Sequence, residues 1–109
     1  MATIEDFKKL DIRVGKIIDV KDFPEAKKPS YKLRIDFGKF GIKRSSAQIT
    51  HLYSKEDLIG KQIIAVINFP VKKIAGLNSE VLVLGIITKD DKVVLLKSER
   101  EVDLGDKIA

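Results

Sequence analysis

The sequence predicts an all-β fold, a small Greek-key barrel with short helices, and three observations support this prediction. Five or six short segments carry the apolar patterning of β-strands. A helix-like segment separates the third strand from the fourth. The chain has 109 residues, 44% of them hydrophobic, which suffices for one core but not for two. We therefore expect a single domain over residues 1–109.

The first elements are a short helix and a long strand. In residues 3–10, Thr3 is placed to cap a helix, acidic residues occupy the first turn and two lysines the last. From residue 12 onward apolar side chains alternate, and Lys16 interrupts the alternation, so we expect a β-bulge near Gly15. The residues expected on the inner face of this strand are Ile12, Val14, Ile18 and Val20.

The clearest strand spans residues 31–37 and follows a loop over residues 22–30 that contains two prolines. Lys32 and Arg34 alternate with apolar residues, so they belong on the outer face of this strand. Residues 42–49 form a third strand with one polar face. The residues expected on the inner face of the second strand are Tyr31, Leu33, Ile35 and Phe37.

Ser54 and Asp57 have capping-box spacing, which predicts a short helix that stops at Gly60. Three strands, a helix and further strands are the layout of the OB-fold, a barrel that binds oligonucleotides and oligosaccharides. Another small barrel and an open α+β sheet are the alternatives. The sequence therefore favours an OB-fold barrel.

The later strands have a different character. Residues 61–69 and 80–88 are apolar on both faces, which is typical of strands buried on two sides or shared with an interface. Residues 70–79 between them are expected to be a ten-residue loop. A turn at Asp90–Asp91 leads into a last hairpin strand. The tail from residue 101 to 109 keeps scattered apolar residues, which indicates a segment docked on a surface.

Several function classes are excluded by composition. The chain has no Cys and one His, so it offers no disulfide, no thiolate site and no His-based metal cluster. No acid–base constellation or Gly-rich phosphate loop is present, so we expect no enzyme activity and no cofactor. The apolar run at residues 81–87 is too short to cross a bilayer, and no signal-type segment is seen. We expect a cytoplasmic protein without membrane insertion.

Positive charge is concentrated in the first three-quarters of the chain. Residues 1–79 hold 16 Lys and Arg against 9 Asp and Glu, whereas residues 80–109 hold 5 against 7. In an OB-fold, the outer face of the second and third strands meets the loops after the first and fourth, and each of these four elements carries basic residues. Phosphate groups suit this arrangement, although an ordinary solvated face is the alternative. The aromatic residues left for base stacking are Phe23, Phe40, Tyr53 and Phe69.

Asn68, Phe69 and Pro70 end an apolar strand, because proline cannot donate to a β-ladder. An exposed Phe69, with Ile74 and Leu77 nearby, would form an apolar patch rimmed by lysines, which suits a peptide as well as RNA. Alternatively, Ile74 and Leu77 plug the barrel.

Six motifs together resemble one known family. They are Asp11–Ile17, Pro24–Leu33, Asp36–Gly38, Ser45–Thr50, Asn68–Pro70 and Ser79–Gly85. From about Phe7 to the C-terminus, the chain resembles the CsaA-like, export-related chaperone branch of the tRNA-binding-domain family. The resemblance implies an OB-fold with added terminal segments and a homodimer formed through those segments. It also implies binding rather than catalysis.

The resemblance leaves two hypotheses for the partner. In the first, a homodimeric chaperone holds unfolded or export-bound polypeptides near Asn68, Phe69, Pro70 and the Lys72–Lys73 pair. In the second, a free-standing protein binds the tRNA elbow by shape, with phosphate contacts from Lys32, Arg34, Lys72 and Lys73. The family's surface motif maps onto Asn68, Lys72 or Lys73, Ser79 and Glu80. The family often has a Met in the loop where this chain reads Ile74–Leu77, and this departure makes an apolar, peptide-favouring patch more plausible.

Overall fold

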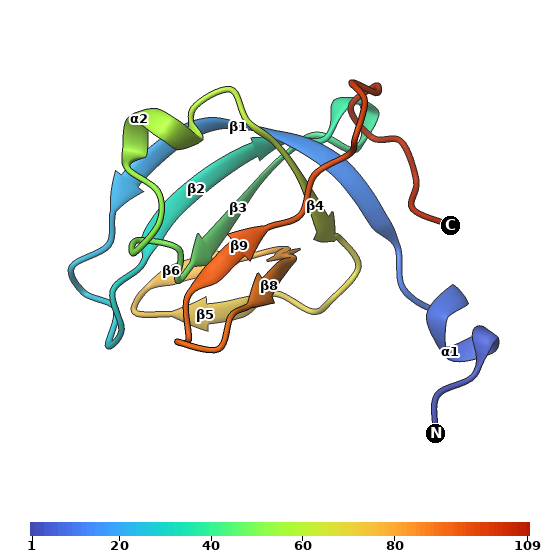
Figure 1. Cartoon of the computed structure of the whole chain (residues 1–109), viewed down its shortest axis with the longest axis horizontal. Helices are drawn as coiled ribbons and strands as arrows, with labels where there is room; N and C mark the ends of the chain where they lie inside the picture. The colour runs from blue at the N-terminus through green and yellow to red at the C-terminus, as the bar shows by residue number, and fades with distance from the viewer.

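The computed structural model describes residues 1–109 as a nearly closed five-stranded antiparallel barrel with a few short helices (Figure 1). The strand order is β3-β2-β1-β4-β7, so that β3 and β7 face each other across the seam of the barrel. This arrangement confirms the predicted OB-fold class. The strands of this sheet are β1 (Ile12–Asp22), β2 (Tyr31–Asp36), β3 (Ile42–Ala47), β4 (Gln62–Val66) and β7 (Leu82–Val83).

The second strand packs as its pattern predicts. Tyr31, Leu33, Ile35 and Phe37 are all buried, with exposed fractions from 9% down to zero. They meet apolar residues of β1, β4 and the helix between β3 and β4 to form one continuous core. The burial of these side chains is the main source of the barrel's stability.

The bulge in β1 lies later in the chain than predicted. The register of the β1–β2 pair shifts around Ile18, not at Gly15. This extra residue turns Ile17 into the core and leaves Ile18 exposed, so the expected inward position of Ile18 is wrong. Gly15 serves a different purpose, because a Cβ atom there would lie 2.6 Å from the ring of Phe37.

The two predicted helices are present, each with the expected cap. Helix α1 (Ile4–Lys8) begins after Thr3, and α2 (Lys55–Leu58) begins after Ser54; each has a complete capping box. Leu58 anchors α2 in the core, whereas α1 buries none of its residues. Figure 1 shows α1 lying apart from the barrel. A single 3-10 turn, η1 (Gly38–Phe40), links β2 to β3.

The expected loop at residues 70–79 is instead a β-hairpin. Strands β5 (Lys72–Ile74) and β6 (Leu77–Ser79) pair with each other across a two-residue turn. Both turn residues, Ala75 and Gly76, have positive φ, the backbone geometry of tight hairpin turns. The prediction failed because Ala-Gly is a weaker hairpin signal than Asn-Gly or Asp-Gly.

The segment at residues 80–88 is not one strand, as predicted, but two. β7 pairs with β4, and after Leu84 the chain continues as β8 (Gly85–Ile87), which pairs with β9 (Val93–Leu95) instead. The predicted turn at Asp90–Asp91 closes this β8–β9 hairpin. Strand β4 ends at Val66, three residues earlier than expected, although one further backbone bond, from the N–H of Ile67 to the carbonyl of Asp11, continues its pairing with β1.

The C-terminal segment docks on its own barrel, which confirms that the tail is a docked segment. The backbone N–H groups of Gly105 and Ile108 donate to the carbonyls of Val14 and Ile12, at 2.8 and 2.9 Å. Arg13 reinforces this contact: its guanidinium donates to the carbonyl of Gly105, pairs with Asp11 and lies 4.4 Å from the ring centre of Phe40. None of the helices is long and apolar enough to span a membrane.

Candidate functional site

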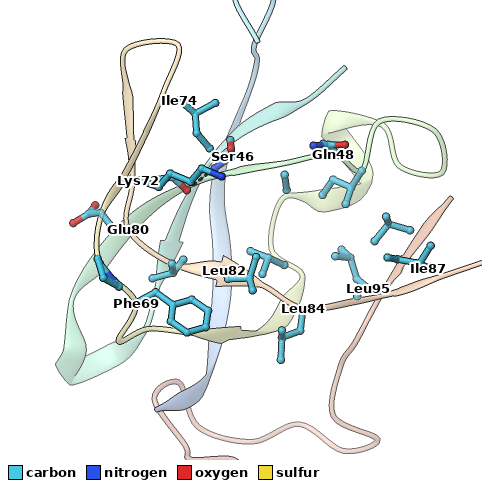
Figure 2. Close-up of a pocket in the computed structure, with 18 residues that line it drawn as sticks. Ser46, Gln48, Phe69, Lys72, Ile74, Glu80, Leu82, Leu84, Ile87 and Leu95 are labelled. Carbon is cyan, nitrogen blue, oxygen red and sulfur yellow. Dashed lines mark hydrogen bonds between the residues drawn. The ribbon is translucent and has the colours of Figure 1, made fainter. Parts of the chain in front are cut away.

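An open, mostly apolar groove of about 620 Å³ lies along the seam of the barrel. The end of β3 and the β5–β6 hairpin form one side, and β7, β8 and β9 form the other (Figure 2). Eleven of its 18 lining residues are hydrophobic. They are Ala47, Ile49, Phe69, Ile74, Val81, Leu82, Val83, Leu84, Ile87, Val93 and Leu95.

The groove exists because the barrel closes at one point and opens beyond it. The buried hydroxyl of Ser45 donates to the carbonyl of Val81 at 3.0 Å and joins β3 to the start of β7. After this contact the paired strands end: β3 at Ala47 and β7 at Val83. Beyond this contact the two edge strands no longer meet, and the groove lies there.

Large apolar side chains in the groove remain open to solvent. The exposed fractions are 42% for Phe69, 49% for Leu82 and 75% for Ile87. Figure 2 shows Leu82 and Leu84 between Phe69 and Leu95, so apolar side chains follow one another along the groove. Contiguous exposed apolar surface on a small domain marks a binding site more often than a packing defect.

The polar rim of the groove contains one free charge. Glu80 is engaged by Arg44: its carboxylate accepts from the Arg44 backbone N–H at 2.9 Å and from Nε at 3.4 Å. The hydroxyl of Ser79 accepts from the backbone N–H of Ser46 at 3.3 Å. Lys72 has no ionic partner. The rim therefore offers a single ammonium group to a ligand.

The structure divides the predicted site residues among four places, the last of which is that of Asn68. Five of them line the groove, namely Phe69, Pro70, Lys72, Ser79 and Glu80. Lys73 is exposed on the β5–β6 hairpin, and its side chain points to the face opposite Lys72 because successive strand residues alternate. Lys32 and Arg34 lie on the outer face of β2.

Asn68 lies outside the groove and has a structural role. Its side-chain nitrogen donates to the carbonyl of Lys9, and its side-chain oxygen accepts from the backbone N–H of Asp11, both at 2.8 Å. The amide thus connects the segment after α1 to the end of β4. Asn68 therefore holds the N-terminal segment against the barrel and does not line the groove.

The outer face of the sheet is basic, as predicted. Lys21 and Lys32 are direct neighbours across β1 and β2, and Arg34 lies opposite Arg44 across β2 and β3. Like charges opposite each other on a sheet repel, so the face is favourable for an anionic partner. Lys32 lies 3.9 Å from Glu25 and Arg44 lies 3.4 Å from Glu80, so both of these charges are partly neutralised.

Few aromatic rings are available for stacking. Phe23 is 3% exposed and lies beneath Lys32, so the prediction that it could stack on bases is wrong. Phe40 is covered by Arg13, and Tyr53 is held by hydrogen bonds to Leu95 and Tyr31. Only Phe69 among the four candidates is an exposed ring. Recognition of single-stranded RNA by stacking is therefore disfavoured.

Sequence reasoning missed half of the groove. The pattern of residues 80–88, which include Leu82, Leu84 and Ile87, predicts a strand that is buried on two sides or shared with an interface, and it does not single these residues out as a binding site. That two-faced pattern was the available signal, since one face packs on the barrel and the other lines the groove. Ser46 and Gln48, on the same face of the third strand, line the groove as well.

The polar side chains that line the groove are few, and they include no cluster of metal-binding type. No three His, Cys, Asp or Glu side chains are close enough to hold a metal ion. The carboxyl groups with lowered pKa values lie elsewhere: hydrogen bonds from Ser54 lower the pKa of Asp57, and a hydrogen bond from Thr88 lowers that of Asp90. What the groove can do chemically is cover apolar groups and pair one negative charge.

Comparison with known proteins identifies the family. The family model described as "Putative tRNA binding domain" matches residues 12–107, nearly the whole chain. The chain belongs to the tRNA-binding domain family. The predicted family and its OB-fold are thereby confirmed.

Within the tRNA-binding domain family, the chain is similar to solved CsaA structures over its full length. It is 59% identical to a CsaA chaperone protein from Picrophilus torridus and 52% identical to chaperone CsaA from Bacillus anthracis, each with a TM-score of 0.95. These matches cover 100% of this chain and 100% and 99% of the two relatives. The predicted resemblance to the CsaA-like branch is confirmed.

A second group of relatives carries this domain as a small part of a larger enzyme. The methionine–tRNA ligase of Pyrococcus horikoshii is 41% identical over 95% of this chain, which corresponds to 14% of the ligase. That of Thermococcus onnurineus is 38% identical over the same shares. The chain therefore spans about a seventh of the length of these ligases and matches a domain appended to them.

Proposed function

We propose that the protein is a CsaA-like molecular chaperone, a homodimeric OB-fold module that binds non-native and export-bound polypeptides in the seam groove. The observation that carries this proposal is that Phe69, Leu82 and Ile87 all line one open groove and remain exposed to solvent. Unfolded segments expose apolar side chains, and their burial here releases water from both surfaces. The two CsaA relatives described as chaperones, similar over their full length, support the same conclusion.

The groove is tested by removing its apolar groups. The double variant Leu82→Thr, Ile87→Thr keeps residues that suit β-strands but removes apolar area. Its matched control is Ile59→Thr, Leu52→Thr, since these residues are 51% and 43% exposed outside the groove. We expect the groove variant to bind a fluorescein-labelled unfolded peptide about tenfold more weakly by anisotropy, with the control unchanged. Equal affinities for the two variants would refute the proposal.

The homodimer is supported by apolar surface outside the groove. On α1, Ile4 is 64% and Phe7 37% exposed, although they occupy one face of the helix. Ile86 and Val94 are cross-strand partners in the β8–β9 hairpin, and both are exposed. A two-fold interface between copies would cover these groups and leave the groove side of the same hairpin free.

A second candidate function, recognition of tRNA by shape and phosphate contacts, is favoured by the basic outer face of β2 and β3. Lys32, Arg34 and Arg44 lie together there, and Lys72 and Lys73 add charge on the nearby hairpin. The family model and the appended domains of the methionine–tRNA ligases support the same candidate. Scarce exposed rings fit a folded RNA better than a single strand.

Salt dependence separates the two candidate functions. Lys72→Glu with Lys73→Glu should abolish binding of labelled bulk tRNA and reduce peptide binding only moderately. Between about 50 and 200 mM salt, tRNA affinity should fall by orders of magnitude if several phosphates are contacted, whereas apolar peptide capture should change little. Unchanged tRNA affinity in the variant would remove the hairpin lysines from the RNA site.

A further inference from the structure

The walls of the seam groove contain strand edges with unused backbone hydrogen-bonding groups. β3 is an edge strand of the five-stranded sheet. The backbone N–H and C=O groups that point away from β2 belong to Arg44, to Ser46 and, just past the end of the strand, to Gln48. Glu80 bonds both backbone groups of Arg44, and Ser79 accepts from the N–H of Ser46. This covering ends at Ser46. The N–H and C=O of Gln48 have no hydrogen-bond partner in the molecule.

The opposite wall has a second free edge. In the β8–β9 pair, backbone bonds join Leu84 to Leu96 and Thr88 to Lys92. Bonded pairs alternate in an antiparallel ladder, so the backbone groups of Gly85 and Ile87 point away from β9. Both residues line the groove and are exposed. Two strand edges with free donors and acceptors therefore border one apolar groove.

We infer that the groove binds its polypeptide as an added β-strand, which fills the open seam and pairs with the backbone of Gln48. This inference rests on the proposed chaperone function and specifies the conformation of the bound segment. Main-chain pairing gives affinity for many sequences, while apolar side chains at alternate positions enter the groove. A binding site that uses backbone groups suits a protein whose partners share no sequence.

The charge at one end of the groove specifies the segment further. Lys72 is the cross-strand partner of Ser79, and Ser79 bonds to Ser46, so the free ammonium lies beside the start of the open edge. Glu80 offers no competing free carboxylate, because Arg44 engages it. The bound segment is therefore an extended, alternating apolar stretch with an acidic side chain at the Lys72 end.

The pairing is tested with N-methylated peptides. The probe is a fluorescein-labelled peptide of alternating valine and threonine that ends in aspartate, compared with isomers that are N-methylated at odd-numbered or at even-numbered residues. All three carry the same side chains. A strand added to one edge loses its hydrogen bonds with only one isomer, so we expect one isomer to bind about tenfold more weakly or worse and the other nearly normally. If both isomers bound as tightly as the unmethylated peptide, the inference would be overturned.

Failure of the inference can be distinguished from failure of the proposed function. Suppose that the unmethylated peptide binds the wild type, binds Leu82→Thr with Ile87→Thr more weakly, and loses no affinity on either pattern of methylation. The chaperone site then stands and strand addition is wrong. If the unmethylated peptide does not bind at all, both are wrong. Amide exchange gives an independent measurement: the N–H of Gln48 should exchange more slowly with peptide present, and that of exposed Leu52 should not change.

The contact between Lys72 and an acidic side chain is tested with a neutral peptide. Replacing the aspartate of the peptide by asparagine should weaken binding about twofold to fivefold at low salt, the range of an exposed ion pair. Lys72→Ser should remove this difference, whereas Lys39→Ser, an exposed lysine outside the groove, should preserve it. A difference that persists in Lys72→Ser would place the acidic side chain elsewhere.

Discussion

Single side chains at the seam decide where this barrel closes. The hydroxyl of Ser45 is fully buried and satisfied by the carbonyls of Val81 and Ser46. A buried hydroxyl needs such partners, because desolvation without a hydrogen bond is costly. One small polar residue thus fixes the end of the closed barrel and the start of the groove.

Gly15 is a position where a single methyl group should disturb the core. An added Cβ would lie 2.6 Å from the Phe37 ring and 2.7 Å from Ile35, closer than nonbonded carbon atoms approach. We expect Gly15→Ala to lower the free energy of unfolding by about 1–3 kcal/mol, the range for overpacked cores, as measured by urea denaturation.

A double-mutant cycle shows whether the ring of Phe37 is the cause. With Phe37→Leu the obstruction is smaller, so the cost of Gly15→Ala should be lower in that background. Strict additivity of the two changes would mean that the contact is not responsible for the loss.

Phe69 distinguishes a binding residue from a core residue. Because the ring is 42% exposed, Phe69→Ala should leave the midpoint of thermal unfolding within a few degrees of the wild type. The same change should weaken capture of unfolded peptide several-fold in an anisotropy titration. A large drop in stability with unchanged peptide affinity would assign Phe69 to the core instead.

At the scale of elements, local signals were reliable where chemistry acts over a few residues. The capping boxes of α1 and α2 and the inner face of β2 could be predicted from the sequence. Predictions failed where contacts between distant parts of the chain determine the local backbone conformation. One case is the bulge, which lies at Ile18 and not at Gly15, because the burial of Ile17 in the core sets its position.

The groove could be predicted only in part for the same reason. Phe69 and Lys72 were identified from a local motif, but Leu82 and Ile87 belong to a segment that switches partners from β4 to β9. The switch follows from how the barrel closes, and no short stretch of sequence encodes that. Asn68 was assigned to the same motif, although its amide bonds to residues nearly 60 positions away.

Helix α2 should show a pH dependence traceable to its cap. Hydrogen bonds from the backbone N–H and hydroxyl of Ser54 lower the pKa of Asp57 from 3.8. A carboxyl whose folded-state pKa is lowered stabilises the fold above its unfolded pKa, and this contribution disappears as the pH falls through the folded-state pKa. Asp57→Asn should therefore lower the thermal midpoint at pH 7 and have progressively less effect below about pH 4.

The neighbouring Glu56 is the control for this prediction. It lies in the same first turn of α2 but takes no part in the capping box. Glu56→Gln should leave the pH profile of the thermal midpoint close to that of the wild type. If Asp57→Asn and Glu56→Gln gave the same profile, the effect would come from helix charge in general and not from the cap.

At the scale of the whole molecule, apolar surface is exposed on both sides of the β8–β9 hairpin. Ile87 and Val93 lie toward the groove, and Ile86 and Val94 lie on the opposite face. The distribution fits a module that keeps one apolar face for its partner and covers another with a second copy. The predicted homodimer and the predicted groove therefore do not compete for the same residues.

The homodimer predicts a definite mass. In sedimentation velocity at micromolar concentration, we expect a species of twice the 12.2 kDa chain mass. Ile4→Ser with Phe7→Ser removes the apolar face of α1 and should shift the population toward single chains, because little buried area would remain on that side. Leu52→Ser, at an exposed site elsewhere, is the control. A wild-type monomer at this concentration would contradict the dimer.

The docked C-terminal segment gives the molecule an unusual mechanical response. Gly105 and Ile108 lie antiparallel to the start of β1, so the two ends of the chain emerge from the same end of this pairing. Tension between the termini would break the hydrogen bonds between this segment and β1 one at a time, as in opening a zipper. The hydrogen bonds between the strands of the barrel would instead carry the load together. The segment should peel away at low force and yield several residues of slack. The barrel and its groove would stay intact while the C-terminal segment is pulled away.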